Sequence, residues 1–558
     1  MKSEVISVLK ITGLSHEEIE KFVEVPKDAN LGDFAFPCFI LAKTWKKNPV
    51  EIAKEIALKL KKIKGFEKIE DVGPYVNFFV DKKDLTFDVL KRISKEKDKY
   101  GSNKKGRNKK FMIEFSQPNT HKAFHVGHIR GTSVGESIAR LFEFSGYKVI
   151  RANYSGDTGM HIAKWIWCYN KFHSKEKAKS DESWFAKIYV EAVQKLEGNE
   201  TGELEVLEIN RKLDERKDKK IIKIWKETRL KSISAWGPIY GDLDVKFNKH
   251  FFESNVEKDG KNIALSLTEK GIAKKSDGAV IMDLKDKNLG VWVLLRSDGT
   301  VLYSAKDLAL AEEKYSKYNV DESLVITSSE QNLHFQQLQK TLEIMKFKKW
   351  ENYKHLGYES VRLPEGKMSS RTGNNVLYAD FKDELINSAK EELSKRESLK
   401  DSELNKRALA IAISSMKYPM LKQDTNKVII FDKTEAVRFE GDTGPYLLYS
   451  YARARSILNK IGKIKNIVKI KEISESEKNL IKEFDSFPEV IVKAKENMNI
   501  SGIAHYTYTL AQTFNEFYHN SQVIGSDEES FRVEIVRAFC QVMENAMHLL
   551  AIPLLKEM

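Results

Sequence analysis

The apolar positions near residue 110 change from the spacing of a strand to that of a helix. Residues 111–115 form an apolar run of strand length, and the spacing from about His128 to Phe144 predicts a helix that ends before Gly146. Residues 147–150 predict the next strand. This order predicts the first βαβ unit of a nucleotide-binding sheet, with the ligand at the N-terminus of the helix.

The regions at the two ends of the chain predict separate modules. Residues 1 to about 100 combine a helical stretch at 41–60 with an alternating stretch at 72–80 that reads as a strand, so we expect a small α+β module. The basic segment 97–110 contains glycine and is predicted to be a linker. After about residue 430 the apolar pattern is that of long helices.

The middle of the chain has a mixed pattern. Residues 170 to 235 are rich in lysine and glutamate with helical periodicity, and residues 243–305 carry short strands with the hairpin dipeptides Asp277-Gly278 and Asp298-Gly299. We interpret this part as an insertion between two halves of the nucleotide fold. The predicted domains are residues 1–105, an α/β domain at 106–430 with an insertion at about 170–300, and a helical domain at 431–558.

Composition and charge narrow the class of protein. A chain of 558 residues is too long for one core. Its formal charge of +13 favours a polyanionic partner such as RNA, although a lysine-rich proteome explains the excess equally well. The three cysteines have no metal-binding or disulfide spacing, and each is expected to be a buried small side chain. No apolar run reaches the length of a membrane span, so we expect a cytoplasmic protein without a membrane partner.

Two short segments carry the chemistry of a phosphate site. His125 and His128 flank Gly127 at the start of the predicted helix, where free N–H groups and the helix dipole favour phosphate. Lys367 lies with Ser369 and Ser370 between two glycines, and its ammonium group suits a pyrophosphate leaving group. Each segment by itself is a weak signal, because an H-x-G-H tetrad can arise by chance in a long chain and an exposed turn is the better explanation of the lysine segment taken alone.

Together these segments resemble the H-I-G-H and K-M-S-K-S signatures of class I aminoacyl-tRNA synthetases. The chain is most similar to the arginyl-tRNA synthetase family, and the resemblance covers nearly its full length. Further stretches that carry it are residues 114–119, 297–303, 330–335 and 439–446. The resemblance implies a Rossmann-type catalytic domain with insertions, an N-terminal domain that binds the tRNA elbow and a C-terminal all-α anticodon-binding domain.

The resemblance also implies roles for individual residues. The second lysine of the K-M-S-K-S signature is missing, since Ser370 stands there, and in this family Lys122 is thought to replace it. The implied catalytic residues are Lys122, His125, His128, Lys367, Ser369 and Ser370. The implied ATP-binding residues are His125, Gly127, His128, His334, Lys367 and Met368. A hydrogen-bonded structural role competes with the ATP role of His334.

The arginine pocket can also be argued from chemistry. A guanidinium group presents five donors in a fixed fork and requires carboxylate partners. Asp307 follows Tyr303 by four residues, which places both on one helix face, although an exposed pair would show the same spacing. By resemblance both hold the guanidinium group, while Glu114, Asn119 and Gln331 bind the rest of the amino acid.

Two residue groups are implied to bind tRNA. Tyr75 and Asn77 match a D-loop contact, an aromatic ring beside an amide, with burial of Tyr75 as the alternative. Tyr446, Tyr449 and Arg453 form a stripe at helical spacing that matches an anticodon-binding surface. A core stripe is the alternative there, and Arg453 argues against full burial.

The expected activity is the ligation of arginine to its tRNA, with ATP as substrate, through an arginyl-adenylate. Mg²⁺ is expected to arrive with ATP without a dedicated set of protein ligands. We further expect a monomer, no editing domain, and activation of arginine only when tRNA is bound. The alternatives are another class I synthetase or nucleotidyltransferase, and a synthetase-like RNA-binding protein without catalysis.

Overall fold

The computed structural model of the chain describes residues 2–364, 377–395, 398–461 and 472–558. They form two compact units, each with a core of its own. The first consists of Met1–Tyr100, Ala454–Pro488 and Leu510–Val542, and the second of Gly101–Arg453, Glu489–Thr509 and Met543–Met558. Four long helices contribute residues to both units: α18 (Gly444–Lys460), α19 (Glu475–Asn497), α20 (Ser501–Asn520) and α21 (Glu529–Leu549).

The N-terminal part of the first unit is an α+β module, as predicted. Its antiparallel sheet has the order β1-β3-β2. The elements are α1 (Lys2–Leu9), α2 (His16–Phe22), β1 (Phe34–Pro37), α3 (Ala42–Trp45), α4 (Pro49–Leu60), β2 (Phe66–Val72), β3 (Tyr75–Val80) and α5 (Lys82–Glu96).

Two details of the prediction for this module were wrong. The stretch 72–80 is not one strand: Gly73, at φ +58°, and Pro74 form a hairpin turn, and the new strand begins at Tyr75. The stretch 41–60 is not one helix, because Lys46 adopts a left-handed conformation and the chain restarts at Pro49. Asn48 caps that second helix through its side chain, and proline is favoured at a first helical position.

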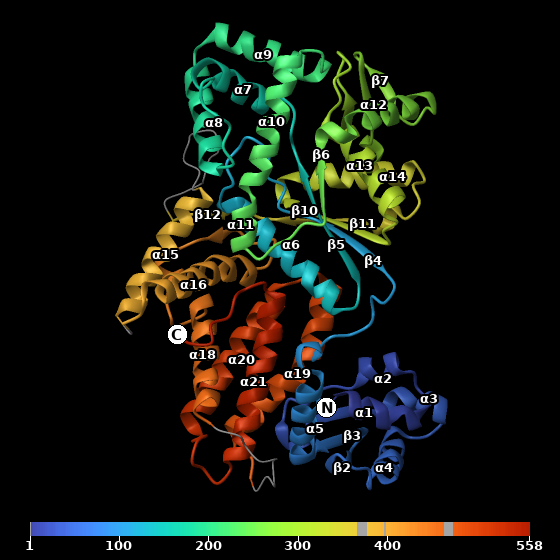
Figure 1. Cartoon of the computed structure of the whole chain (residues 1–558). Helices are drawn as coiled ribbons and strands as arrows, with labels where there is room; N and C mark the ends of the chain where they lie inside the picture. The colour runs from blue at the N-terminus through green and yellow to red at the C-terminus, as the bar shows by residue number, and fades with distance from the viewer. Residues whose placement is uncertain (1, 365–376, 396–397, 462–471) are drawn as a thin grey trace. The chain divides into compact units, whose positions relative to one another are not determined.

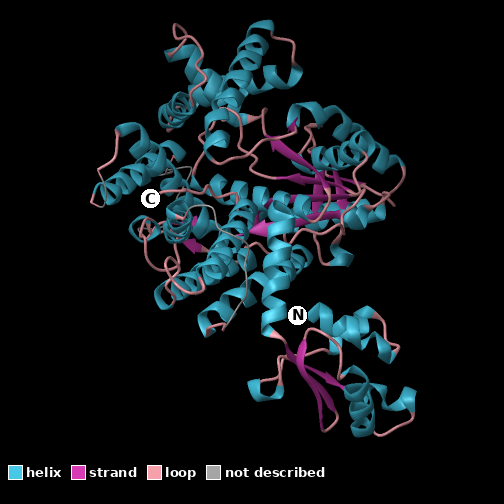
Figure 2. Ribbon diagram, turned by 60° about the horizontal axis from the view of Figure 1, so that its bottom comes forward, coloured by secondary structure: helices cyan, strands magenta, loops and turns pink. Residues whose placement is uncertain are grey.

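The second unit is built on a five-stranded parallel sheet in the order β11-β10-β4-β5-β6 (Figures 1 and 2). Its strands are β4 (Lys110–Glu114), β5 (Lys148–Ser155), β6 (Lys249–Phe252), β10 (Glu322–Ser328) and β11 (Tyr353–Tyr358). In chain order this is the 3-2-1-4-5 arrangement of a doubly wound nucleotide-binding fold. The predicted Rossmann-type fold class is therefore confirmed, and the switch point lies between β4 and β10.

Helix α6 (Val126–Phe144) follows the first strand, as predicted, and is buried on almost every side. It contains three glycines, and their small size permits close packing. A Cβ atom on Gly135, for example, would lie 2.2 Å from the Phe115 ring. The ring of Phe142 stacks on Phe111 of β4 with centroids 3.9 Å apart. This helix is thus fixed against the sheet, and its N-terminus is held at the carboxyl ends of the strands.

The region between β5 and β10 contains most of the added structure. Its helices are α7 (Met160–Phe172), α8 (Glu182–Leu196), α9 (Glu200–Glu215), α10 (Lys219–Ala235), α11 (Gly237–Asp242), α12 (Glu253–Glu269) and α13 (Tyr303–Tyr318). Strand β6 lies inside the range predicted as an insertion, yet it is an edge strand of the main sheet. The remaining elements of this unit are α14 (Asn332–Ile344), β12 (Val361–Arg362), α15 (Tyr378–Ser394), α16 (Asp401–Lys422), β13 (Ile429–Ile430) and α17 (Lys433–Ala436).

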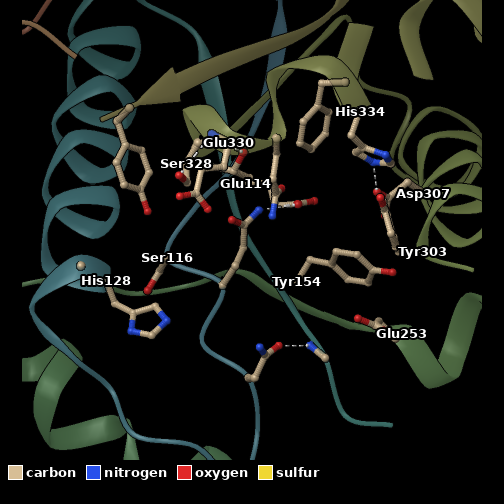
Figure 3. Close-up of a pocket in the computed structure, with 18 of the residues that line it drawn as sticks. Glu114, Ser116, His128, Tyr154, Glu253, Tyr303, Asp307, Ser328, Glu330 and His334 are labelled. Carbon is tan, nitrogen blue, oxygen red and sulfur yellow. Dashed lines mark hydrogen bonds and ion pairs between the residues drawn. The ribbon is translucent and has the colours of Figure 1, made fainter. Parts of the chain in front are cut away.

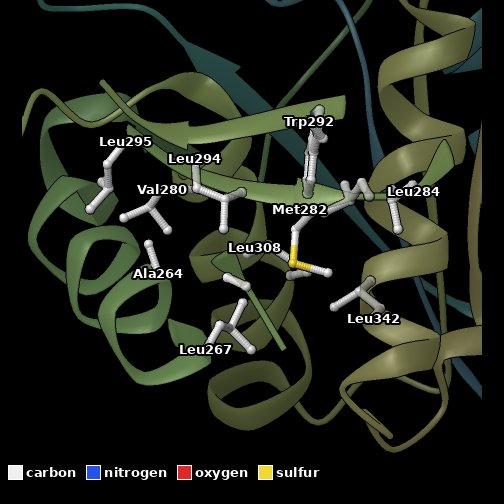
Figure 4. Packing of buried hydrophobic residues seen from close by; sticks show 14 of the residues in the cluster. Ala264, Leu267, Val280, Met282, Leu284, Trp292, Leu294, Leu295, Leu308 and Leu342 are labelled. Carbon is white, nitrogen blue, oxygen red and sulfur yellow. The ribbon is translucent and has the colours of Figure 1, made fainter. Parts of the chain in front are cut away.

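A small antiparallel sheet supports helix α13. Strands β7 (Lys274–Ser276), β8 (Ala279–Asp283) and β9 (Val291–Leu295) pair in order, and Asp277-Gly278 forms the predicted hairpin turn. Met282 and Trp292 from this sheet pack against Leu308 of α13 and Leu342 of α14 in one buried cluster (Figure 4). The cluster fixes the helix that carries Tyr303 and Asp307.

Candidate functional site

A cavity of about 650 Å³ lies at the switch point of the parallel sheet. Four strands contribute to it at their carboxyl ends, where doubly wound folds bind ligands. Glu114 ends β4, Tyr154 lies near the end of β5, Ser328 ends β10 and Tyr358 ends β11. The N-terminus of α6 and the first turn of α13 complete the walls (Figure 3).

The loop from β4 to α6 has an unusual backbone. Ser116, Gln117 and His121 have φ values of +76°, +49° and +64°, in the left-handed region that non-glycine residues rarely adopt. His121 is fully buried, and its imidazole Nε2 and backbone N–H contact Thr228 and Ser232 of α10. Helix α10 therefore holds a strained loop in place, and strain of this kind accumulates at functional sites.

His125 and His128 form the N-terminal cap of α6. The backbone N–H of Gly127 donates to His125 Nδ1, and the backbone N–H of His125 donates to His128 Nδ1, each at 3.2 Å. Because an N–H group only donates, both Nδ1 atoms are unprotonated, and the Nε2 atom of each neutral ring carries the hydrogen. The two ring centroids lie 3.9 Å apart. A Cβ atom on Gly127 would lie only 3.0 Å from the His125 ring, which explains the glycine.

The charge near the imidazole pair comes from a lysine. Burial and the neighbouring Lys122 lower the pKa of His125 to about 4, and burial with the His125 and Lys122 charges holds the pKa of His128 well below its usual range. Both imidazoles are therefore neutral donors at physiological pH. Lys122 lines a second cavity, of about 1150 Å³, beside His125 and His128, and burial lowers the pKa of its ammonium group.

Tyr303 and Asp307 both line the first cavity from α13, as their spacing predicts. Asp307 Oδ2 lies 2.7 Å from His334 Nε2. The indole N–H of Trp292 donates to His334 Nδ1 at 3.2 Å, so Nε2 carries the hydrogen and donates to the carboxylate. The Tyr303 ring lies 4.7 Å from the imidazole. Both nitrogens of His334 are therefore used by protein groups, which favours the structural alternative to its predicted ATP contact.

A second acidic residue at this end of the cavity was missed in the sequence. Glu253 is the first residue after β6, and its carboxylate is paired with Lys306 Nζ at 2.9 Å. It lines the cavity together with Asp307 (Figure 3). An acid directly after a parallel strand would have been the sequence signal. The strand has only four residues and lies in a range interpreted as an insertion, so the signal was not recognised.

The other residues predicted to contact arginine also line the first cavity. Glu114 is buried and accepts a hydrogen bond from Gln117, and its second carboxylate oxygen lies 2.6 Å from the buried Lys314 ammonium group. Asn119 accepts a hydrogen bond from the backbone N–H of Gly156. Gln331 lies just before α14. The structure therefore brings together all five predicted arginine-binding residues: Glu114, Asn119, Tyr303, Asp307 and Gln331.

The other predicted residues lie elsewhere. Lys367, Met368, Ser369 and Ser370 lie outside the described residues. On β3, Tyr75 is half-buried with its ring edge-on to Phe39, and the buried Asn77 has no hydrogen-bond partner for its Oδ1 atom among the described residues. On α18, the predicted stripe of Tyr446, Tyr449 and Arg453 exists and is half-buried, with the Arg453 guanidinium 4.7 Å from the Tyr449 ring centroid.

Comparison with known proteins gives matches along the whole chain. The family described as "tRNA synthetases class I (R), catalytic domain" matches residues 89–433. An arginyl-tRNA synthetase N-terminal domain matches residues 1–80, and a DALR anticodon-binding domain matches residues 447–558. The chain belongs to the class I arginyl-tRNA synthetase family.

Individual relatives agree with this membership. The arginine–tRNA ligases of Clostridium acetobutylicum and Clostridium botulinum strain Loch Maree are each 34% identical over 98% of both chains. In fold, the chain is similar to the arginyl-tRNA synthetases of Thermus thermophilus and Plasmodium falciparum, with TM-scores of 0.80 and 0.76 and identities of 23% and 21%. Each alignment covers 100% of this chain and 99% of the other.

Three further features of this member of the arginyl-tRNA synthetase family concern its cysteines, the character of its helices and a cluster with metal-ligand geometry. Cys38, Cys168 and Cys540 are all buried, as predicted. In the described part of the chain, no helix combines the length and the apolar character needed to cross a bilayer. The described residues contain one cluster with metal-ligand geometry, Cys168 with His173 and Glu191, which belongs to α7, α8 and the segment between them.

Proposed function

We propose that this chain is an arginine–tRNA ligase. A carboxylate oxygen of arginine attacks the α-phosphorus of ATP, the bond from that phosphorus to the bridging oxygen breaks, and pyrophosphate leaves. A ribose hydroxyl of the terminal adenosine of tRNA then attacks the carbonyl carbon of the adenylate, and AMP leaves. No protein side chain needs to form a covalent bond, so catalysis consists of positioning and charge stabilisation.

The observation that carries this proposal is the composition of the first cavity at its two ends. One end has the His125–His128 pair at a helix N-terminus, and the other has Asp307 and Glu253. The first end is suited to phosphate and the second to a cationic, planar group. A substrate that places a carboxylate at one end and a guanidinium group at the other is arginine.

At the phosphate end, we assign the Nε2–H groups of His125 and His128 to phosphate oxygens. Neutral imidazoles can donate without repelling the Lys122 ammonium group beside them. We assign Lys122 to the negative charge that develops around the α-phosphate. Lys367, Ser369 and Ser370 are proposed to act on the departing pyrophosphate and Met368 to contact ATP, on the strength of the sequence resemblance alone.

At the arginine end, we propose that Asp307 and Glu253 bind the guanidinium group and that the Tyr303 ring lies against it. Glu114, Asn119 and Gln331 are assigned to the α-amino end of the substrate. His334 is assigned to the orientation of Asp307, since it donates to that carboxylate. A ligand with fewer donors would lose hydrogen bonds to these two partly buried carboxylates, which permits strong discrimination without an editing site.

Mg²⁺ fits this proposal only as a companion of ATP. Magnesium requires oxygen ligands, but the one described cluster with metal-ligand geometry supplies a thiol and an imidazole. It involves none of the residues that we assign to ATP. We therefore expect the triphosphate itself to carry the ion, and no step above depends on a protein-bound metal.

The remaining assignments rest on the sequence. We propose residues 1–105 as a tRNA-elbow domain with Tyr75 and Asn77 as contacts, residues 106–430 as the catalytic domain, and residues 431–558 as the anticodon-binding domain with Tyr446, Tyr449 and Arg453 on its surface. We also propose that arginine is activated only in the presence of tRNA, and that the protein acts as a cytoplasmic monomer.

The test is ATP–pyrophosphate exchange with each of the twenty amino acids, with and without the matching tRNA. Exchange with arginine, and only when tRNA for arginine is present, is the expected result. Exchange with another amino acid in place of arginine would identify a different synthetase. Binding of tRNA without any exchange would favour the non-catalytic alternative.

A further inference from the structure

Tyr154 is a residue of the cavity that neither the sequence patterns nor the mechanism above uses. It lies near the end of β5, and part of its ring faces the cavity. Its hydroxyl group is shielded from solvent and has no hydrogen-bond partner among the described residues. Figure 3 shows the ring pointing to the end of the cavity where Asp307 and Glu253 lie.

Two other buried tyrosines of this unit have partners for their hydroxyl groups. The Tyr240 hydroxyl contacts Ser116 and Asn153, and the Tyr378 hydroxyl contacts Asp242. In the described ranges, Tyr315 is the other tyrosine with a buried hydroxyl lacking a hydrogen-bond partner, and it does not line the cavity. Leaving such a group unpaired destabilises the free protein, so a partner that arrives with a ligand would explain why Tyr154 is present.

The surroundings of Tyr154 indicate which ligand group that partner is. Burial and four carboxylates, led by Asp307 and Glu253, hold the pKa of its phenol well above the usual range, so the hydroxyl stays protonated. Asp307 and Glu253 can each accept hydrogen bonds but cannot donate. A neutral hydroxyl between them can donate to one carboxylate and still accept from a ligand, whereas a third carboxylate would add repulsion.

We propose that Tyr154 is a specificity-determining residue for arginine. Its ring supports the aliphatic chain of the substrate, and its hydroxyl accepts a hydrogen bond from the guanidinium group while donating to Asp307 or Glu253. This inference rests on the proposed function, because it takes arginine as the ligand. A guanidinium group has five donors, so an added acceptor completes its hydrogen bonding in a dry site.

The experiment compares Tyr154→Phe with Tyr315→Phe in the full-length protein. Both variants lose one buried tyrosine hydroxyl, but only the first change lies in the cavity. Steady-state kinetics of arginylation should show a rise in the KM for arginine of about 10- to 150-fold for Tyr154→Phe, the range expected for one hydrogen bond to a charged group. The KM for ATP should stay unchanged, and Tyr315→Phe should leave both values unchanged.

Thermal melting supplies a second readout that does not depend on turnover. Without arginine, Tyr154→Phe should melt at or above the temperature of the unmodified protein, because the lost hydroxyl had no partner. Saturating arginine should raise the melting temperature of the unmodified protein more than that of the variant. A variant that melts lower without ligand would show that the hydroxyl is already paired, and the inference would then be wrong.

A wrong assignment of Tyr154 and a wrong proposed function would give different experimental results. If the unmodified protein does not attach arginine to tRNA, the proposed function itself is refuted. If it does, and Tyr154→Phe keeps the same KM for arginine, the role of Tyr154 is refuted while the function stands. An equal rise in the KM for arginine and for ATP would also refute it, since that result indicates a general disturbance of the cavity.

Discussion

Replacing His334 by phenylalanine tests how the acidic end of the cavity is held in position. The imidazole is 8% exposed, donates to Asp307 and accepts from the Trp292 indole. Phenylalanine keeps the ring that packs against Tyr303 and removes both hydrogen bonds. Asp307 would then be free to turn away from the position in which we propose that it binds the guanidinium group.

The magnitude follows from the bonds that are lost. A hydrogen bond to a charged group contributes about 1.5–3 kcal/mol, so the KM for arginine should rise about 10- to 150-fold. The Trp292 indole N–H would also be left buried without an acceptor, which should lower the free energy of unfolding by about 1–3 kcal/mol. The KM for ATP should not change, because neither bond reaches the phosphate end of the cavity.

The assay is ATP–pyrophosphate exchange in the presence of tRNA, with arginine and ATP varied separately, and denaturant unfolding for stability. His355→Phe is a matched control: this half-buried imidazole contacts Thr327 and stacks on Phe335 but does not line the first cavity. It should leave both KM values unchanged. If His334→Phe raised the KM for ATP and left that for arginine unchanged, the ATP contact implied by the sequence resemblance would be correct and our assignment wrong.

Three further outcomes can be measured directly. Asp307→Asn should lower kcat/KM for arginine at least about 100-fold without changing the KM for ATP, as read by exchange kinetics, because it removes one of the two carboxylates that we propose for the guanidinium charge. The Glu182 carboxylate accepts from the Phe124 N–H, and burial raises its pKa to about 7, so the folded state binds more protons than the unfolded state from about pH 4.5 to 7. The unfolding free energy of the protein, compared with that of the Glu182→Gln variant, should therefore fall by up to roughly 3 kcal/mol as the pH rises through 7. If denaturant unfolding gave the same difference between the two proteins at pH 5 and at pH 8, the result would contradict this prediction. Gly260→Ala should cost about 1–3 kcal/mol of stability in denaturant unfolding, because its Cβ atom would lie 2.7 Å from a carbonyl oxygen of the neighbouring helix, whereas Gly502→Ala meets open space and should not destabilise.

Much of the site could be predicted because its key residues are neighbours in sequence. His125 and His128 share one helix turn, and Tyr303 and Asp307 share another, so local spacing already places each pair on one face. The first βαβ unit was predicted for a similar reason, since its helix is long and follows an apolar strand. The stripe on α18 exists for the same reason, although its contact with RNA stays a prediction.

What could not be predicted depends on contacts between distant segments. Glu253 reaches the cavity only because a four-residue strand joins the main sheet, and so short a strand carries too little periodicity to be separated from an insertion. The pairing of Lys306 with Glu253 spans 53 positions and leaves no local pattern. The turn at Gly73 and Pro74 lies inside a run in which apolar and polar residues alternate. Because the alternation continues across the turn, the pattern predicted one strand where the structure has the end of one strand and the start of the next.

The protonation state of the imidazole pair is another property that could not be predicted from the sequence. The sequence signature indicates two histidines at a phosphate site, and a cationic pair would satisfy that signature as well as a neutral one. The structure decides between them, because two backbone N–H groups occupy the Nδ1 atoms while burial and Lys122 disfavour further protonation. In the proposed function, two neutral donors and one lysine bind the nucleotide without the repulsion that three adjacent cations would exert on one another. The helix cap thus fixes the tautomer that the proposed phosphate contact requires, and the same two hydrogen bonds serve the fold and the proposed chemistry.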